Sequence, residues 1–340
     1  MSEKIRFAII GHGHIGKRHA EMVRRDPDAQ LVAVCDIADQ DVSALDVPFF
    51  KSAEELFRSG LPFDVVNVCT PNGMHAHHAM MAIQAGKHVV VEKPMALSKA
   101  ACEELIHAGL AKGVNIFCVM QNRYSPPAKW LKEVVSNGTL GDVYMVQLNC
   151  YWNRDDRYYK KGGWKGTADM DGGTLFTQFS HFIDIMYWVF GDITDIQGKF
   201  ADFCHQQSTD FEDSGMVNFR FLKGGLGCIN YSTAVWDCNM ESSITITGSK
   251  GSLKIGGQYM NEVEYCHIKD YIMPQLEESS PANDYGAYKG SASNHHFIIR
   301  NVIETLQGRT TITTNALEGL KVVEIIESIY DLRNRSQSIK

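Results

Sequence analysis

Short apolar runs alternate with amphipathic stretches over residues 5–120. The runs are rich in valine and isoleucine, which is typical of strands buried on both faces of a parallel sheet. The stretches between them have helical spacing, and glycines such as Gly86 and Gly113 end two of them. Strands that alternate with helices predict an α/β fold with a parallel, doubly wound sheet. The expected strands are 5–10, 30–35, 65–69, 88–92 and 115–120, and the expected helices are 15–25, 52–58, 75–85 and 98–112.

The pattern changes near Gln121, where the parallel sheet should end. After this point, runs with period-two alternation are separated by glycine pairs and polar turns, which predicts an α+β domain with a largely antiparallel sheet. We therefore expect a dinucleotide-binding domain over 1–122 and a second domain over 123–340. The second domain should contain strands at 142–152, 211–221, 226–234, 242–247 and 252–255, and helices ending near 137 and spanning 174–190, 294–306 and 314–334.

A glycine-rich turn, GHGHIG at 11–16, follows the first predicted strand. Gly11 would make the tight turn, Gly13 would let a pyrophosphate approach the backbone, and Gly16 would let helix and strand pack closely. The next helix would offer free N–H groups and a positive dipole end to the phosphates. Asp36 ends the second strand, where an acid binds ribose hydroxyls and repels a 2′-phosphate. The motif predicts a Rossmann domain that favours NAD over NADP; a plain turn residue is the alternative for Asp36.

A second charged motif closes the valine strand at 88–92, where Glu92 and Lys93 precede Pro94. Open α/β sheets bind their ligands at the carboxyl ends of their strands. The pair is thus predicted to face a ligand, although ordinary solvated charges at a strand end would give the same sequence.

The helix predicted at 174–190 is apolar on almost every face, which is typical of a buried helix. Four residues with polar atoms, Thr177, His181, Asp184 and Trp188, nevertheless share one stripe. Buried polar groups need partners, so this stripe is either an internal hydrogen-bond network or the wall of a site. Because the histidine lies one turn from an acid, we favour the site.

Composition narrows the class of protein further. With 340 residues and a net charge of −7, the chain should form about two domains, with no reason to expect nucleic acid or a membrane as a partner. It has no signal-peptide pattern and no apolar run of roughly 18 residues. Nine cysteines without a CxxC pair favour a reduced, cytoplasmic protein. His75, His77 and His78 lack a nearby acid or cysteine, so we expect a helix start facing the cofactor or solvent and no metal.

These motifs resemble those of the glucose–fructose oxidoreductase/inositol dehydrogenase family (Gfo/Idh/MocA), and the resemblance covers nearly the whole chain. It implies a Rossmann domain and an α+β domain whose open sheet commonly builds homodimers or homotetramers. The family pattern also implies NAD as cofactor and a cis peptide between Lys93 and Pro94. The motifs concerned are 11–16 with Asp36, 70–72 with His75, 86–94, 172–184 and 248–251.

The resemblance implies cofactor contacts from the glycine loop, the neighbouring strand ends and the start of the second domain. The residues expected there are Gly11, Gly13, His14, Ile15, Gly16, Asp36, Thr70, Pro71, Asn72, His75, Glu92, Lys93 and Gln121.

Within the family, the chain is most similar to the UDP-N-acetyl-2-amino-2-deoxy-D-glucuronate 3-dehydrogenases of bacterial surface-polysaccharide synthesis. Two departures matter. Thr177 stands where the inositol branch has a catalytic aspartate and the glucuronate branch an asparagine, and Lys165 replaces an arginine. The first departure moves proton transfer to His181 and Lys93. The second keeps a cation but weakens a bidentate hold on a carboxylate.

The resemblance implies oxidation of a sugar hydroxyl, best matched by C3 of UDP-N-acetylglucosaminuronate. His181 would accept the proton, and Lys93 would stabilise the charge that develops on the oxygen. Supporting roles fall to Glu92, Asp184 and Thr177. The candidate substrate residues are Arg123, Tyr151, Tyr158, Trp164, Lys165 and Gln178, beside the basic segment 154–161, most of whose charges are by default a solvated loop.

Three other functions stay open on the sequence. A dehydrogenase of free inositol or aldose is the alternative within the same chemistry. Some relatives use bound NAD transiently to hydrolyse glycosides, and others are NAD-sensing regulators without catalysis. A regulator could lose Lys93 and His181 freely, and this chain has both.

Overall fold

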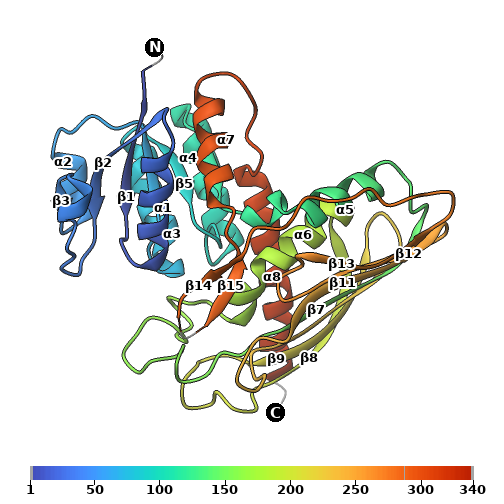
Figure 1. Ribbon diagram of the computed structural model, residues 1–340. Helices are drawn as coiled ribbons and strands as arrows, with labels where there is room; N and C mark the ends of the chain where they lie inside the picture. The colour runs from blue at the N-terminus through green and yellow to red at the C-terminus, as the bar shows by residue number, and fades with distance from the viewer. Residues whose placement is uncertain (1–2, 287, 338–340) are drawn as a thin grey trace. The chain divides into compact units, whose positions relative to one another are not determined.

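The computed structural model describes residues 3–286 and 288–337, and the chain divides into two compact units (Figure 1). Unit 1 comprises Met1–Met120 and His295–Val323, and unit 2 comprises Gln121–Asn294 and Glu324–Lys340. The first boundary lies close to the predicted one. The predicted division differs later in the chain, because it assigned all of 123–340 to the second domain.

The returning segment joins unit 1 by backbone pairing at the edge of its sheet. Cys118 donates its N–H to the carbonyl of Thr314 at 2.9 Å, and Phe117 forms an isolated antiparallel bridge with Asn315. This pairing joins residues almost 200 positions apart, so it cannot be predicted from a local pattern in the sequence.

Unit 1 contains six parallel strands in the order β3-β2-β1-β4-β5-β6, as predicted for a doubly wound sheet. Helix α1 packs against α7, and α3 packs against α4. The strand bounds are β1 Ile5–Ile10, β2 Ala29–Cys35, β3 Phe49–Phe50, β4 Val65–Val68, β5 His88–Val91 and β6 Ile116–Cys118. The helix bounds are α1 His14–Arg25, η1 Ser43–Leu45, α2 Ala53–Arg58, η2 Asn72–Met74, α3 His75–Gln84, α4 Lys99–Lys112 and α7 His295–Leu306.

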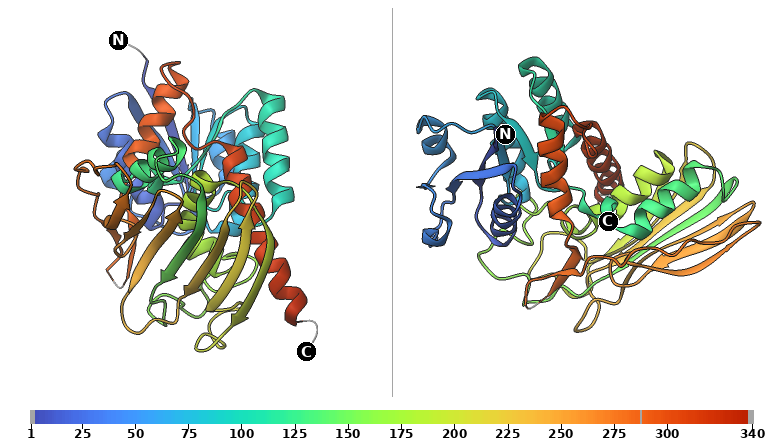
Figure 2. Two further views of the ribbon diagram at one scale, coloured as in Figure 1. Left: turned by 90° about the vertical axis from the view of Figure 1, so that its right-hand side faces the viewer. Right: turned by 45° about the horizontal axis from the view of Figure 1, so that its top comes forward.

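Unit 2 is built on a seven-stranded sheet in the order β13-β12-β11-β7-β10-β9-β8 (Figures 1 and 2). Only β7 and β10 pair in parallel, so the prediction of a largely antiparallel sheet is confirmed. The strand bounds are β7 Val143–Tyr151, β8 Ile193–Ala201, β9 Ser214–Phe221, β10 Leu226–Ser232, β11 Glu241–Gly248, β12 Gly251–Gly256 and β13 Glu262–Ile268, with a hairpin of β14 Ala282–Asp284 and β15 Lys289–Ala292. The helices are η3 Gln121–Tyr124, α5 Pro126–Ser136, η4 Leu175–Phe179, α6 Ser180–Phe190 and α8 Ala316–Gln337, which contributes to both units.

One face of this sheet is buried and the other is exposed. Along β9, Val217 and Phe219 are buried and Met216 is exposed, which is the alternation of a half-buried strand. Met145 on β7 lies directly opposite Leu226 on β10, and both are about half exposed. The outer face therefore carries large apolar side chains in adjacent positions.

The predicted buried helix forms as a π-turn, η4, that runs into α6. Its start is fixed from α8, where the Tyr330 hydroxyl accepts the N–H of Leu175 at 2.8 Å. Gly173 lies at φ +132°, and a Cβ there would come within 2.5 Å of the Tyr330 hydroxyl. Gly173 is thus needed for this close approach.

None of the helices in the described part of the chain is long and apolar enough to span a membrane.

Candidate functional site

The glycine loop of unit 1 forms an open cradle at the start of α1. Gly11 has φ +90°, and a Cβ on Gly16 would lie 1.9 Å from the Gly11 carbonyl oxygen, so both positions require glycine. A Cβ on Gly13 would meet no atom within 4 Å, and no side chain caps the helix there. This space beside free helix N–H groups fits the pyrophosphate of a dinucleotide.

Asp36 and Ile37 follow β2 beside this loop. The Asp36 carboxylate accepts the N–H of His12 at 2.6 Å and that of Ala38 at 2.8 Å, so it is fixed against the glycine loop. Ile37 is 90% exposed. An acid beside an exposed apolar side chain suits the ribose and adenine of NAD. Ile37 was not among the predicted cofactor residues, although its position directly after Asp36 could have indicated a cofactor contact.

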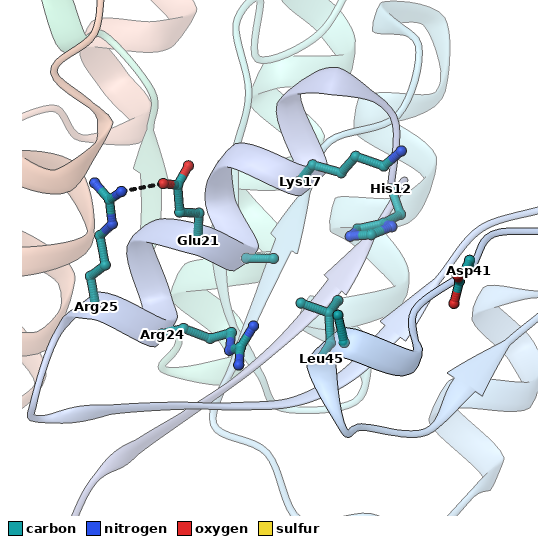
Figure 3. A pocket seen from close by; sticks show the side chains of 9 residues that line it. His12, Lys17, Glu21, Arg24, Arg25, Asp41 and Leu45 are labelled. Atoms are coloured by element: carbon teal, nitrogen blue, oxygen red, sulfur yellow. Dashed lines mark ion pairs between the residues drawn. The ribbon is translucent and has the colours of Figure 1, made fainter.

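A cavity of about 490 Å³ lies next to the loop, against α1 and the η1 turn (Figure 3). Lys17 and Arg24 line it together with Asp41, and the His12 ring reaches into it. Burial lowers the pKa of His12, and neither ring nitrogen has a hydrogen-bond partner among the described residues. Arg25 and Glu21, which form an ion pair, also line the cavity, so cations and acids are mixed along its wall.

His75 connects the turn after β4 to the turn after β5 through its two ring nitrogens. Its Nδ1 lies 2.7 Å from the Pro94 carbonyl, and its Nε2 lies 2.8 Å from the Thr70 carbonyl. Burial lowers the pKa of this histidine. Because β4 and β5 are parallel neighbours, the predicted cofactor segment at 70–72 and the Lys93 turn lie at the same edge of the sheet.

At the end of β5, the Lys93–Pro94 peptide is cis, as predicted. Lys93 is partly exposed, whereas Glu92 is only 5% exposed. The Glu92 carboxylate accepts a hydrogen bond from His19 on α1 at 2.9 Å. His19 was not among the predicted site residues, although it shares the buried face of α1 with Gly16, Ala20 and Val23.

On the buried helix of unit 2, His181 and Asp184 have different partners. The His181 Nε2 lies 3.1 Å from the amide nitrogen of Gln121. Asp184 accepts two hydrogen bonds from Arg123, at 2.8 and 2.6 Å, and the guanidinium lies 5.2 Å from the Trp188 ring centre. Asp184 is thus part of an internal ion pair. The orienting role of Asp184 and the substrate role of Arg123 stay predictions.

Thr177 belongs to a separate contact. Its hydroxyl donates to the Asp171 backbone carbonyl at 3.0 Å and to the Asp171 carboxylate, which also accepts the N–H of Gly166 at 2.8 Å. These bonds hold the 166–171 loop against the helix.

Arg154, in the basic segment 154–161 predicted beside the substrate residues, is a buried cation and not part of a solvated loop. It is 2% exposed, and no carboxylate pairs with it in the described part of the chain. Its Nε donates to Gln178 Oε1 at 2.6 Å, and Gln178 Nε2 donates to the Tyr158 hydroxyl at 2.8 Å. The remaining contacts are the Asn153 and Lys289 carbonyls, the Asn239 amide, and the rings of Trp152, Tyr158 and Tyr288.

Lys165 lies on the same aromatic cluster. Its Nζ is 3.8 Å from the Tyr158 ring centre and donates to the Tyr288 hydroxyl at 3.0 Å. A cavity of about 360 Å³ is lined by Lys160, Lys161 and Lys165, by glycines of the same loop, and by residues 206–210, which include Asp210. Of the other predicted substrate residues, Trp164 is partly buried in this loop, and Tyr151 is partly buried at the end of β7.

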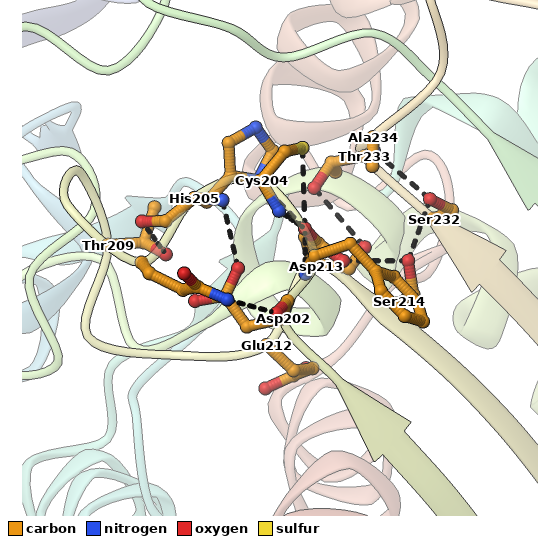
Figure 4. A network of polar contacts seen from close by, with 12 residues as sticks. Asp202, Cys204, His205, Thr209, Glu212, Asp213, Ser214, Ser232, Thr233 and Ala234 are labelled. Atoms are coloured by element: carbon orange, nitrogen blue, oxygen red, sulfur yellow. Dashed lines mark hydrogen bonds and ion pairs between the residues drawn. The ribbon is translucent and has the colours of Figure 1, made fainter.

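A further polar cluster in unit 2 centres on Asp213 (Figure 4). Its carboxylate accepts the N–H groups of Phe203 and Cys204, at 2.8 and 2.9 Å, and the Ser214 hydroxyl at 2.8 Å. Burial raises the pKa of the Cys204 thiol to about 11, so this cysteine is no nucleophile at neutral pH. The cluster holds a loop in place.

The chain is similar to known oxidoreductases over almost its full length. Residues 5–119 match the oxidoreductase family with an NAD-binding Rossmann fold (GFO/IDH/MocA), and residues 129–254 match the GFO/IDH/MocA C-terminal domain. The D-glucoside 3-dehydrogenase of Escherichia coli is 30% identical, with 97% of this chain and 95% of that protein covered.

Two solved structures are also similar in fold. The WlbA dehydrogenase from Bordetella pertussis, in complex with NADH and UDP-GlcNAcA, is 30% identical with a TM-score of 0.86, covering 97% of this chain and 96% of that chain. WlbA from Chromobacterium violaceum, in complex with the same two molecules, is 31% identical with a TM-score of 0.87, covering 99% and 95%.

The position of Asp36 predicts that NAD binds at least tenfold more tightly than NADP, or about 1.4 kcal/mol, because its carboxylate would repel a 2′-phosphate. Asp36→Ser should narrow this gap. Asp39→Ser removes an exposed acid three residues away and should leave the gap unchanged. Calorimetric titration of the three proteins with NADH and NADPH measures it, and equal binding by the unchanged protein would contradict the ribose assignment.

Proposed function

Because the chain belongs to the GFO/IDH/MocA family of NAD-dependent sugar oxidoreductases, we propose that it oxidises a nucleotide-linked sugar acid. The proposed reaction is oxidation of C3 of UDP-N-acetylglucosaminuronate in bacterial surface-polysaccharide synthesis. The two WlbA structures, which hold NADH and UDP-GlcNAcA, support this choice of substrate.

The observation that carries the proposal is the cationic and aromatic cluster of unit 2. Burying the Arg154 guanidinium without a carboxylate leaves a positive charge that carbonyl dipoles and aromatic rings stabilise but do not cancel. Lys165 adds a second cation on the Tyr158 ring. Such a cluster favours a ligand with a diphosphate and a carboxylate, which accept charge-assisted hydrogen bonds, over a neutral sugar.

We assign the chemical roles to one residue in each unit. Bound NAD supplies the hydride acceptor. His181 accepts the hydroxyl proton, since a neutral imidazole suits this task near pH 7. The Lys93 ammonium stabilises the charge that develops on the substrate oxygen.

Oxidation of a free glucoside, aldose or inositol is the second candidate. This candidate has equal support from sequence identity, because the chain is 30% identical both to the E. coli D-glucoside 3-dehydrogenase and to the B. pertussis WlbA. A neutral sugar would, however, gain little from the cations around Tyr158. A hydrolase would release free sugar without net NADH, and a regulator would turn over no sugar.

We also propose that the exposed face of the unit 2 sheet joins two copies of the chain, giving a homodimer or homotetramer. The apolar side chains Met145, Leu226 and Met216 are about half exposed or more on the adjacent strands β7, β10 and β9 of this face, and Tyr265 on the edge strand β13 is also about half exposed. Removing such a surface from water would stabilise the association of a second copy.

We expect NADH formation with UDP-N-acetylglucosaminuronate and much less with UDP-N-acetylglucosamine, which lacks the carboxylate. Loss of one charged partner should cost on the order of 10²-fold in kcat/KM. Lys165→Met should raise KM for the uronate, whereas Lys223→Met, a change on the turn between β9 and β10, serves as a charge-matched control. The measurement is NADH absorbance over nucleotide sugars, aldoses and inositols. A strong signal with a free sugar and none with any nucleotide sugar would refute the proposal.

Lys93→Met and His181→Asn should each lower kcat by roughly 10²-fold while NAD affinity stays nearly intact. Thr177→Ala should cost much less, because its hydroxyl holds a loop through Asp171. Steady-state kinetics and NADH titration separate these effects. Near-normal turnover of His181→Asn would reassign proton transfer to Lys93.

Light scattering after gel filtration should find a dimer or tetramer. Leu226→Glu places a charge on the exposed sheet face and should shift the protein toward smaller species. Leu110→Glu, on an exposed part of α4, is the matched control and should leave the size of the species unchanged. A monomeric unchanged protein would overturn this assignment.

A further inference from the structure

The Glu92 carboxylate lies between two histidines from opposite ends of the unit 1 sequence. His19 on α1 is fully buried, and His295, the first residue of α7, is 2% exposed. Their Nε2 atoms lie 2.9 and 3.5 Å from the same carboxylate oxygen. The two imidazole rings meet edge to face with their centres 5.6 Å apart.

The hydrogen bonds define the protonation of His19. The Asn67 side-chain amide nitrogen, on β4, lies 2.9 Å from His19 Nδ1. An amide N–H only donates, so Nδ1 accepts, and the ring proton lies on Nε2, where it points at Glu92. With this amide beside Nδ1, the Nε2 of His19 is the donor that faces Glu92.

Glu92 is ionised in spite of its burial. Burial alone would raise the pKa of Glu92, but the hydrogen bond from His19 and the nearby His295 imidazole outweigh this effect and hold the pKa well below its usual range. Burial lowers the pKa of His295, which keeps this ring neutral at pH 7.

The second oxygen of Glu92 connects this network to the lysine. Glu92 Oε2 accepts the backbone N–H of Lys93 at 3.2 Å. The carboxylate is therefore bound on one side by α1 and α7 and on the other by the peptide that carries the Lys93 side chain. Since α1 begins at the glycine loop, the same contacts join that loop to the Lys93 turn.

We propose that His19, with Asn67 and His295, is a positioning residue that keeps Glu92 ionised and thereby fixes the Lys93 turn for catalysis. The proposal rests on the role assigned to Lys93 above. The other titratable or charged groups that face Glu92 or these histidines are Cys69, His75, Lys93 and Arg18. Burial raises the pKa of the Cys69 thiol and lowers that of His75.

The test compares His19→Phe, His19→Gln and Val23→Ala in the holoenzyme. Phenylalanine removes the donor, so the pKa of Glu92 should rise, and the acid limb of the kcat–pH profile should move to higher pH. We expect kcat at pH 7 to fall roughly tenfold, with KM for NAD within about threefold of its original value. Glutamine can still donate and should restore much of the loss. Val23→Ala opens a cavity on the same buried face of α1 and should leave the acid limb in place.

A second measurement does not depend on substrate. Reductive methylation of Lys93, followed by mass spectrometry from pH 6 to 8, reports the environment of its amine in each protein. His19→Phe should change the Lys93 rate at least threefold, whereas Val23→Ala should not. If the unchanged protein oxidises no sugar, the proposed function fails. The methylation rate of Lys93 then still tests whether His19 fixes the Lys93 turn. An unmoved acid limb or Lys93 rate in His19→Phe, or equal changes in Val23→Ala, would overturn the positioning role.

Discussion

Both units depend on how each buried charge is compensated, because a charge removed from water without compensation is strongly destabilising. Glu92, Arg123 and Arg154 are each at most 5% exposed, and each is compensated differently. Glu92 lies against the imidazoles of His19 and His295, and Arg123 forms a bidentate pair with Asp184. Among residues 3–286 and 288–337, Arg154 is bound by dipoles and aromatic rings. The Arg123 pair is neutral as a whole, whereas the Arg154 cluster keeps a positive charge that an anionic ligand would complete.

The features that could be predicted from the sequence are those with a local physical cause. The strand Ile5–Ile10 forms at the predicted residues, since a short apolar run before a glycine turn leaves few alternatives. The helix predicted at 174–190 also forms, with a π-turn at its start that periodicity does not reveal. The glycine motif was equally predictable, because Gly11 and Gly16 fill positions where a side chain would collide with the backbone.

The features that were missed depend on residues far apart in the chain. Arg154 sits among charged neighbours, so its sequence resembles that of a solvated loop. Two of its contacts come from Asn239 and Lys289, more than 80 residues away. His19 has a partner at Glu92 for the same reason, and the return of 295–323 to unit 1 follows from pairing with β6. The helical periodicity of α1 showed that His19 is buried, but periodicity cannot identify the partner of a buried group.

The exchange at position 177 bears on which group can act as a base in unit 2. A threonine hydroxyl cannot accept a proton near neutral pH as a carboxylate can. The nearest carboxylate, Asp171, already accepts the Thr177 hydroxyl and the Gly166 N–H, and Asp184 is bound by Arg123. Both acids flanking the histidine are therefore engaged by donors within unit 2. Among the described side chains of this helix, His181 is the group whose ordinary pKa suits proton transfer near pH 7. The loss of a carboxylate at 177 thus supports assigning the proton to His181 in the proposed reaction.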